Sequence, residues 1–173
     1  MKNLPIGLQS IEKIRAKDCI YVDKTQFAFE LIKGGASHYF LSRPRRFGKS
    51  LFVSTLEEIF KGSKALFEGY HIAQSGHDWQ PYPVLLFDFG VIANQTPDEL
   101  KADLNDGLIT MGTEQGITVE GPSLESQLKA LIKGLCKKYQ KVKKIFFDTG
   151  YKGFSTRLLK NRRNGLLHSP HPP

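Results

Sequence analysis

The chain has 173 residues, 40% of them hydrophobic and 24% charged, which fits about one globular domain. No apolar run approaches the ~20 residues of a membrane-spanning helix, and the N-terminus lacks the apolar segment of a signal peptide. Two cysteines are too few for a disulfide framework. These features predict a protein of the reducing cytoplasm with no membrane partner.

The net charge of +8 is concentrated in the last quarter of the chain. Residues 137–173 contain ten lysines and arginines and one acid, so they carry +9, whereas residues 1–136 carry −1. A basic end can bind nucleic acid by neutralising phosphates, and it is equally typical of a solvated tail. Residues 149–173 have no sustained periodicity and end in prolines, which favours the tail.

The first half of the chain predicts strands that alternate with helices. In chain order these are a short strand over 19–23, a helix over 25–33, a strand over 38–42 and an amphipathic helix over 49–62. Two glycines follow the first helix and stop it. The turn between the second strand and the second helix is rich in arginine.

The second half continues the alternation. The nearly continuous apolar run over 83–89 is typical of a buried parallel strand. Thr96 followed by Pro97 and two acids predicts a helix start, and Ser123 predicts another. A last strand is predicted over 142–148. This order indicates an α/β layered fold.

The turn before the second helix has the context of a phosphate-binding loop. A helix that opens directly after a strand presents free backbone N–H groups and the positive end of its dipole. Gly48 permits close approach of the backbone, Lys49 would reach the β- and γ-phosphates, and the Ser50 hydroxyl would bind Mg²⁺. The predicted cofactor-binding residues here are Arg43, Pro44, Arg45, Arg46, Phe47, Gly48, Lys49, Ser50 and Leu51.

The loop departs from the pattern G-x-x-x-x-G-K-[ST] at its start. Arg43 stands where the first glycine belongs. The alternative interpretation is a basic turn that only begins a helix.

The chain resembles the predicted AAA-ATPase-like family through LPIGLQSIEKIR, YVDKT, YFLSRPRRFGKSLFVSTL and YPVLLFDF. The resemblance implies ATP and Mg²⁺ as ligands and explains Arg43 as a family variant. It also implies a P-loop NTPase-like three-layer αβα fold with a partial, mostly parallel sheet over residues 1–148, followed by the tail 149–173. Many members of that family carry a C-terminal nuclease-like domain of the PD-(D/E)XK type.

The resemblance also suggests further site residues. An apolar strand that ends in aspartate orients Mg²⁺ through a water in such ATPases, and Asp148 is the position that matches, while Asp88 ends an earlier strand. Asp23, in YVDKT, either lies near the nucleotide base or caps the next helix. The residue after Asp148 is Thr149, where the family has a glutamate that activates water, so we expect impaired hydrolysis.

Two other functions stay open. The chain could be a non-catalytic nucleic-acid binder that uses its basic end. It could also be a truncated or frame-shifted product of a longer gene, because family pattern and periodicity both stop near Asp148. Such a fragment would leave sheet edges exposed and would aggregate.

Overall fold

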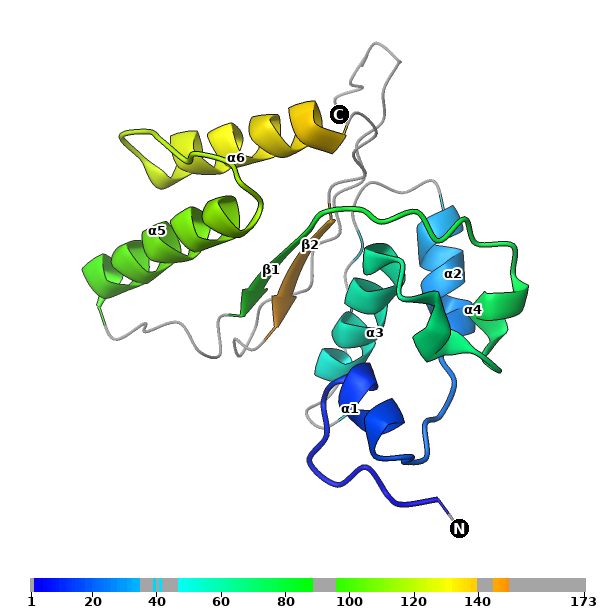
Figure 1. Ribbon diagram of the computed structural model, residues 1–173. Coiled ribbons are helices and arrows are strands. Elements are labelled where there is room, and N and C mark those ends of the chain that lie inside the picture. Colours follow the sequence, from blue (N-terminus) through cyan, green and yellow to red (C-terminus); the bar gives the residue numbers. More distant parts are fainter. Residues whose placement is uncertain are drawn as a thin grey trace, which may run out of the picture.

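The computed structural model describes residues 2–34, 39, 41, 47–87 and 96–139, and the backbone of 88 and 145–149. The helices of these residues are α1 (Ile11–Ala16), α2 (Thr25–Lys33), α3 (Lys49–Lys61), α4 (His71–Gln74), α5 (Pro97–Glu114), α6 (Leu124–Tyr139) and the 3-10 helix η1 (Lys64–Phe67). The strands are β1 (Val84–Asp88) and β2 (Ile145–Thr149). Helix therefore dominates the described chain, with little strand (Figure 1).

The two strands form a parallel pair between two groups of helices. Their register aligns Val84 with Ile145 and Asp88 with Thr149. Alternate residues of a strand point to opposite faces, and β1 has apolar partners on both. Val84 and Leu86 pack with the group formed by α1–α4, whereas Leu85 packs with α5 and α6 (Figure 1). A strand that is covered on both faces explains the continuous apolar run in the sequence.

Helix α3 is the centre of the first group. Its buried residues Val53, Leu56, Ile59 and Phe60 face α1, α2, η1 and α4. The helix ends at Gly62, whose φ of 81° suits the left-handed position after a helix. A Cβ at Gly62 would also stand 2.7 Å from the Trp79 carbonyl oxygen, so glycine is required there for space as well.

The second group consists of α5 and α6, and its helix starts are those expected from the sequence. The Thr96 hydroxyl accepts a hydrogen bond from the Glu99 N–H (3.2 Å), and the Glu99 carboxylate accepts one from the Thr96 N–H (3.1 Å). This reciprocal pair is a capping box. The Ser123 hydroxyl accepts from the Ser126 N–H at the start of α6. Leu108, Leu131 and Leu135 form the buried contact between the helices and β1.

The predicted long helices and the last two strands are confirmed, and the first strand is wrong. Residues 19–23 form no strand, because only an isolated bridge joins Cys19 to Asn3. Of the predicted strand 38–42, Tyr39 and Leu41 are described and neither belongs to a strand, and the other three residues lie outside the described residues. The short elements α1, η1 and α4 were not predicted.

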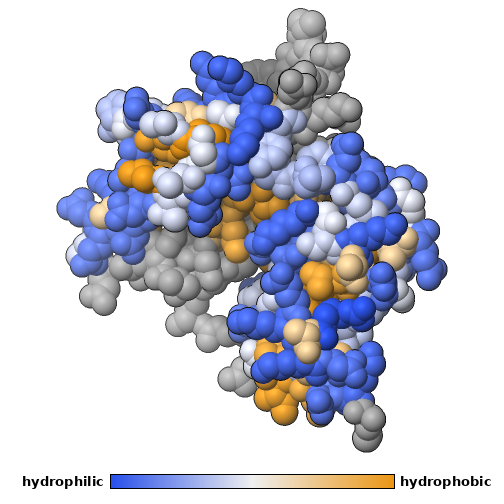
Figure 2. All heavy atoms as spheres, viewed as in Figure 1, coloured by the Kyte–Doolittle hydropathy of each residue, from blue (hydrophilic) through white to orange (hydrophobic). Residues whose placement is uncertain are grey.

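The face of the molecule that Figure 2 shows is mostly hydrophilic over the described residues, with some apolar exposure. Figure 2 shows apolar atoms over the N-terminal segment, where Leu4 and Ile6 are exposed, and between the two helical groups. No helix within the described residues is long and apolar enough to cross a bilayer.

Candidate functional site

The start of α3 has the geometry of an open helix N-terminus. Gly48 precedes it with φ 74° and ψ 25°, and its carbonyl accepts the first helical hydrogen bond, from the Phe52 N–H at 2.9 Å. Within the described residues no side chain caps this end. A Cβ at Gly48 would meet nothing within 4 Å in the described structure, so the left-handed backbone, rather than crowding, requires glycine here.

This helix start lies toward the carboxyl ends of the two strands. The Phe60 carbonyl, near the end of α3, accepts a hydrogen bond from the Tyr82 N–H (2.7 Å) just before β1 begins. From that point α3 and β1 run in opposite directions along each other (Figure 1). The register places Asp148 opposite Phe87, next to Asp88, at the same strand ends. The backbones of the two strand-end aspartates are therefore toward the end of the molecule where α3 begins (Figure 1).

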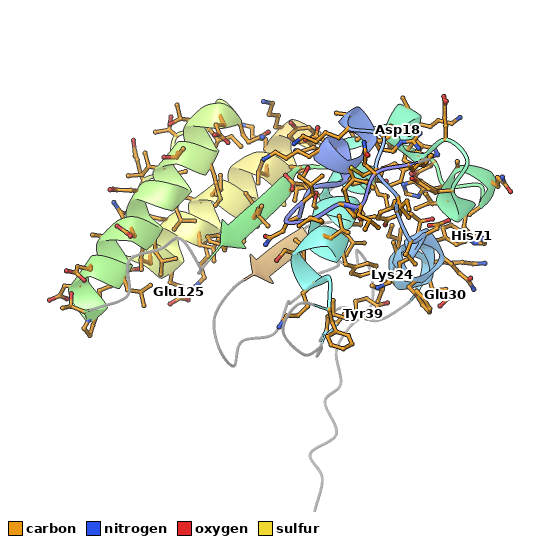
Figure 3. All side chains as sticks on the ribbon, turned by 90° about the horizontal axis from the view of Figure 1, so that it is seen from below. Asp18, Lys24, Glu30, Tyr39, His71 and Glu125 are labelled. Atoms are coloured by element: carbon orange, nitrogen blue, oxygen red, sulfur yellow. The ribbon has the colours of Figure 1, made fainter. Side chains whose placement is uncertain are left out.

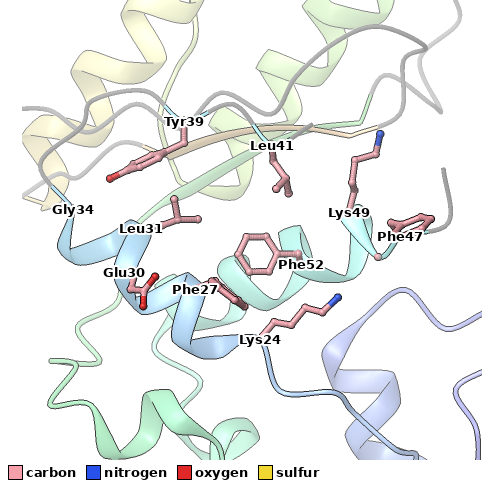
Figure 4. A pocket seen from close by; sticks show the side chains of 11 residues that line it. Lys24, Phe27, Glu30, Leu31, Gly34, Tyr39, Leu41, Phe47, Lys49 and Phe52 are labelled. Carbon is pink, nitrogen blue, oxygen red and sulfur yellow. The ribbon is translucent and has the colours of Figure 1, made fainter. Parts of the chain in front are cut away.

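A pocket of about 430 Å³ opens between α2 and the start of α3 (Figure 4). Its lining combines residues of both helices with Tyr39 and Leu41 of the connecting segment (Figure 4). Figure 3 shows three of the lining residues, Lys24, Glu30 and Tyr39, on one side of the molecule. The full lining is Lys24, Phe27, Glu30, Leu31, Gly34, Tyr39, Leu41, Phe47, Gly48, Lys49 and Phe52. A cavity of this size and mixed chemistry is typical of a small-molecule site.

Helix α2 has a second apolar face that explains its part in the pocket. Thr25 and Ala28 are buried against the core. Phe27 and Leu31 lie four residues apart on another stripe and line the pocket, with Phe27 56% exposed. A helix that packed only against a core would carry polar residues on that stripe. This surplus apolar stripe is the sequence signal that could have revealed the pocket.

Lys24 and Lys49 give the pocket its positive charge. No carboxylate of the described residues lies within ion-pair distance of either ammonium group. In Figure 4 both ammonium groups are at the same end of the pocket, beside Phe47. An anionic ligand group could therefore bind either ammonium group without displacing an ion pair between described residues.

Apart from Asp23, the predicted site residues fall into four sets. Phe47, Gly48 and Lys49 line the pocket, whereas Ser50 and Leu51 are half-buried in the first turn of α3 outside the lining. Arg43, Pro44, Arg45 and Arg46 lie outside the described residues. For Asp148 the structure gives the backbone position only. Within the described residues no group of three or more His, Cys, Asp or Glu could hold a metal.

The YVDKT segment divides between the pocket and the core. Lys24 lines the pocket. The Asp23 carboxylate accepts hydrogen bonds from the Thr25 N–H (2.8 Å) and hydroxyl (2.7 Å) and from the His71 N–H (2.8 Å). It thus joins the start of α2 to the start of α4. The Tyr21 hydroxyl bonds the Thr55 hydroxyl of α3 at 3.1 Å, and burial raises the pKa of Tyr21.

Asp23 is expected to make the stability of the fold sensitive to acid. Burial alone would raise its pKa, but the hydrogen bonds from Thr25 and His71 outweigh burial and hold the pKa below its ordinary value of 3.8. The ionised form therefore stabilises the fold above the unfolded-state pKa, and this contribution is lost as the pH falls through the folded-state pKa. We expect Asp23→Asn to unfold more easily at pH 7 and to lose less stability than wild type between pH 5 and pH 3.

Urea unfolding of both proteins at pH 7, 5 and 3 measures this difference. Asp106→Asn, exposed on α5, is the matched control and should keep the wild-type pH profile. An unchanged pH profile in Asp23→Asn would show that the carboxylate does not hold the two helix starts together.

Comparison with known proteins decides the family. The family described as predicted AAA-ATPase matches residues 5–164. The chain belongs to the predicted AAA-ATPase-like family. Membership supports an ATP-binding, ATPase-like role, with nucleotide and typically Mg²⁺ as ligands. The range that matches the AAA-ATPase-like family continues past Asp148.

A curated relative is similar to part of this AAA-ATPase-like chain. It is an uncharacterized protein in the vnfD 5′ region of Azotobacter chroococcum mcd 1, 55% identical over 91 residues. The match covers 51% of this chain and 17% of the relative, so the chain spans only a small part of that protein. No solved structure matches the chain.

Proposed function

We propose that the chain binds MgATP with the triphosphate at the N-terminus of α3. The observation that carries this is the left-handed Gly48 followed by Lys49, at a helix start that opens into the pocket. The backbone N–H groups of the first turn and the Lys49 ammonium both favour an anion at this place. Membership of the AAA-ATPase-like family supports ATP as the nucleotide.

The remaining site residues take roles around that phosphate position. Residues 43–51 would bind the phosphates, Ser50 would hold Mg²⁺ directly, and Asp148 would hold it through a water. In support of this role, the backbone of Asp148 lies near the carboxyl end of β2, one register position from Asp88. Asp23 lies next to Lys24 in the chain, and Lys24 lines the pocket. We propose that Asp23 contributes to nucleotide binding by holding this segment in place. Bound Mg²⁺ would neutralise phosphate charge and polarise the γ-phosphate.

The proposal extends to the fold and to the rate of reaction. Residues 1–148 form a P-loop domain with helices on both sides of a mostly parallel sheet, and residues 149–173 form a basic tail. The helices on both faces of β1 support this. Hydrolysis is slow because Thr149 follows Asp148 and a threonine hydroxyl stays protonated at neutral pH, so it is no general base.

Calorimetric titration with MgATP tests the phosphate site. Removing a charged hydrogen-bond partner costs about 1.5–3 kcal/mol, so Lys49→Ala should bind MgATP roughly 10–150-fold more weakly than wild type. Lys101→Ala, on the remote helix α5, should bind as wild type does. Equal affinity in wild type and Lys49→Ala would refute the proposed site.

The same titration separates the two strand-end aspartates. With Asp148→Asn the advantage of Mg²⁺ over metal-free ATP should shrink, whereas Asp88→Asn should keep it. The reverse outcome would assign the metal to Asp88, which occupies the neighbouring register position.

A further inference from the structure

The pocket beside α3 has two chemically different ends. Figure 4 shows the ammonium groups of Lys24 and Lys49 at one end. The Glu30 carboxylate and the Tyr39 hydroxyl are at the other. The Tyr39 hydroxyl is near the end of α2, since a Cβ at Gly34 would lie 2.3 Å from it and 3.0 Å from the Glu30 carbonyl oxygen. The pocket thus runs from a cationic end to an end with hydrogen-bonding oxygens.

Apolar side chains line the space between these ends. Phe27 and Leu31 come from α2, and Phe52 comes from the first turns of α3. Apolar side chains offer a phosphate group neither a hydrogen bond nor an opposite charge, whereas a planar heterocyclic ring stacks on aromatic side chains. The volume of about 430 Å³ is also more than a phosphate group needs. The apolar middle of the pocket therefore fits the organic part of a ligand whose anionic part lies at Lys49.

The Glu30 carboxylate determines which ligand groups the end of the pocket opposite Lys49 would bind. An ionised carboxylate only accepts hydrogen bonds. One Glu30 oxygen already accepts from the Gln26 amide at 3.1 Å on the same helix. The carboxylate retains acceptor capacity for a ligand donor such as an exocyclic amino group.

We infer that the Glu30 end of the pocket holds the adenine ring of the nucleotide, with Phe27 and Phe52 against the ring and Glu30 accepting a hydrogen bond from its 6-amino group. This inference rests on the proposed function, because Lys49 must hold the triphosphate for the ring to reach Glu30. Helix α2 would then be the element that selects the base.

Three ligands separate the base site from the phosphate site in a calorimetric titration. They are MgATP, the magnesium complex of tripolyphosphate, which has no base, and purine riboside 5′-triphosphate, which lacks the 6-amino group. Stacking of a base on an aromatic ring contributes about 1–3 kcal/mol by alanine substitution. We expect Phe27→Ala to bind MgATP roughly 5–150-fold more weakly and to bind tripolyphosphate as wild type does.

The Glu30 contact has its own readout. Wild type should prefer MgATP to purine riboside triphosphate by about 10-fold or more. Glu30→Ala should bind the two nucleotides equally. Val22→Ala, also strongly exposed but outside the pocket lining, is the control and should keep both the affinity and the preference. Phe27 is 56% exposed, so its truncation should change the unfolding midpoint of the free protein far less than truncation of a buried ring.

The outcomes distinguish this inference from the proposal beneath it. If Lys49→Ala weakens MgATP binding but Phe27→Ala and Glu30→Ala do not, the phosphate site stands and the base lies elsewhere. If Phe27→Ala weakens tripolyphosphate as much as MgATP, the ring of Phe27 does not act on the base, and the inference fails. If neither MgATP nor tripolyphosphate binds wild type, both the inference and the proposed function are wrong.

Discussion

Replacing Thr149 with glutamate is expected to raise the rate of ATP hydrolysis by roughly 10²–10⁴-fold, the usual contribution of a positioned general base. Thr149 is the last residue of β2 and stands opposite Asp88 in the register. It directly follows Asp148, where the AAA-ATPase-like resemblance places a water-activating glutamate. A carboxylate at this position would accept a proton from the attacking water, which the threonine hydroxyl does not do at neutral pH.

Steady-state phosphate release at saturating MgATP measures this gain. Thr149→Gln is the matched control, because it has the size of glutamate without a base, and it should hydrolyse at the wild-type rate. The double variant Lys49→Ala with Thr149→Glu should lose the gain if hydrolysis occurs at the proposed site. A Thr149→Glu protein that binds MgATP but gains no activity would contradict the position assigned to the base.

Phe67→Ala is expected to destabilise the fold by about 3–5 kcal/mol. Phe67 has no exposed surface and belongs to the core around α3. Its ring lies 5.5 Å from the Trp79 ring, centroid to centroid. Truncation removes this contact and leaves a cavity among residues of η1, α3 and α4, which cannot all close around it. The loss is a large share of the 5–15 kcal/mol typical of a whole domain.

Urea unfolding followed by tryptophan fluorescence gives the free energy of unfolding, because the single Trp79 reports on this part of the core. The control is Phe27→Ala, the same substitution at a ring that is 56% exposed, which should cost far less. A loss below 1 kcal/mol in Phe67→Ala would mean that the packing around η1 does not hold the first helical group together.

Local patterns predicted the long elements because the relevant signals are close in sequence. The capping box at Thr96 and Glu99 spans four residues, and the leucine stripe of α6 repeats every turn. The helices α1 and α4 have six and four residues, too few to show a helical period, and were missed for that reason. The run 19–23 has β-prone residues, yet a single bridge to Asn3 is its only strand-like pairing among described residues.

The candidate site was predicted in part. The order strand, Gly48, Lys49, helix is a local signal, and the structure places Gly48 and Lys49 at the start of α3 as expected. The part played by α2 was not predicted beyond the segment that contains Lys24. Phe27 and Leu31 are as apolar as Phe29 and Ile32, which pack against the core. Periodicity alone does not say which of two apolar stripes meets the core.

The sequence by itself determined where α2, α3, α5 and α6 form and that Gly48 immediately precedes α3. It also determined that both strands are apolar and that each has an aspartate at or one residue before its end. Only the tertiary structure decided that β1 and β2 pair in a register that brings Asp88 and Asp148 to the same edge. The tertiary structure also decided that the Asp23 carboxylate accepts a hydrogen bond from the His71 N–H and that Lys24 lines the pocket. The physical reason is that caps and periods act within a few residues, whereas pairing and pockets depend on which apolar faces meet across the fold.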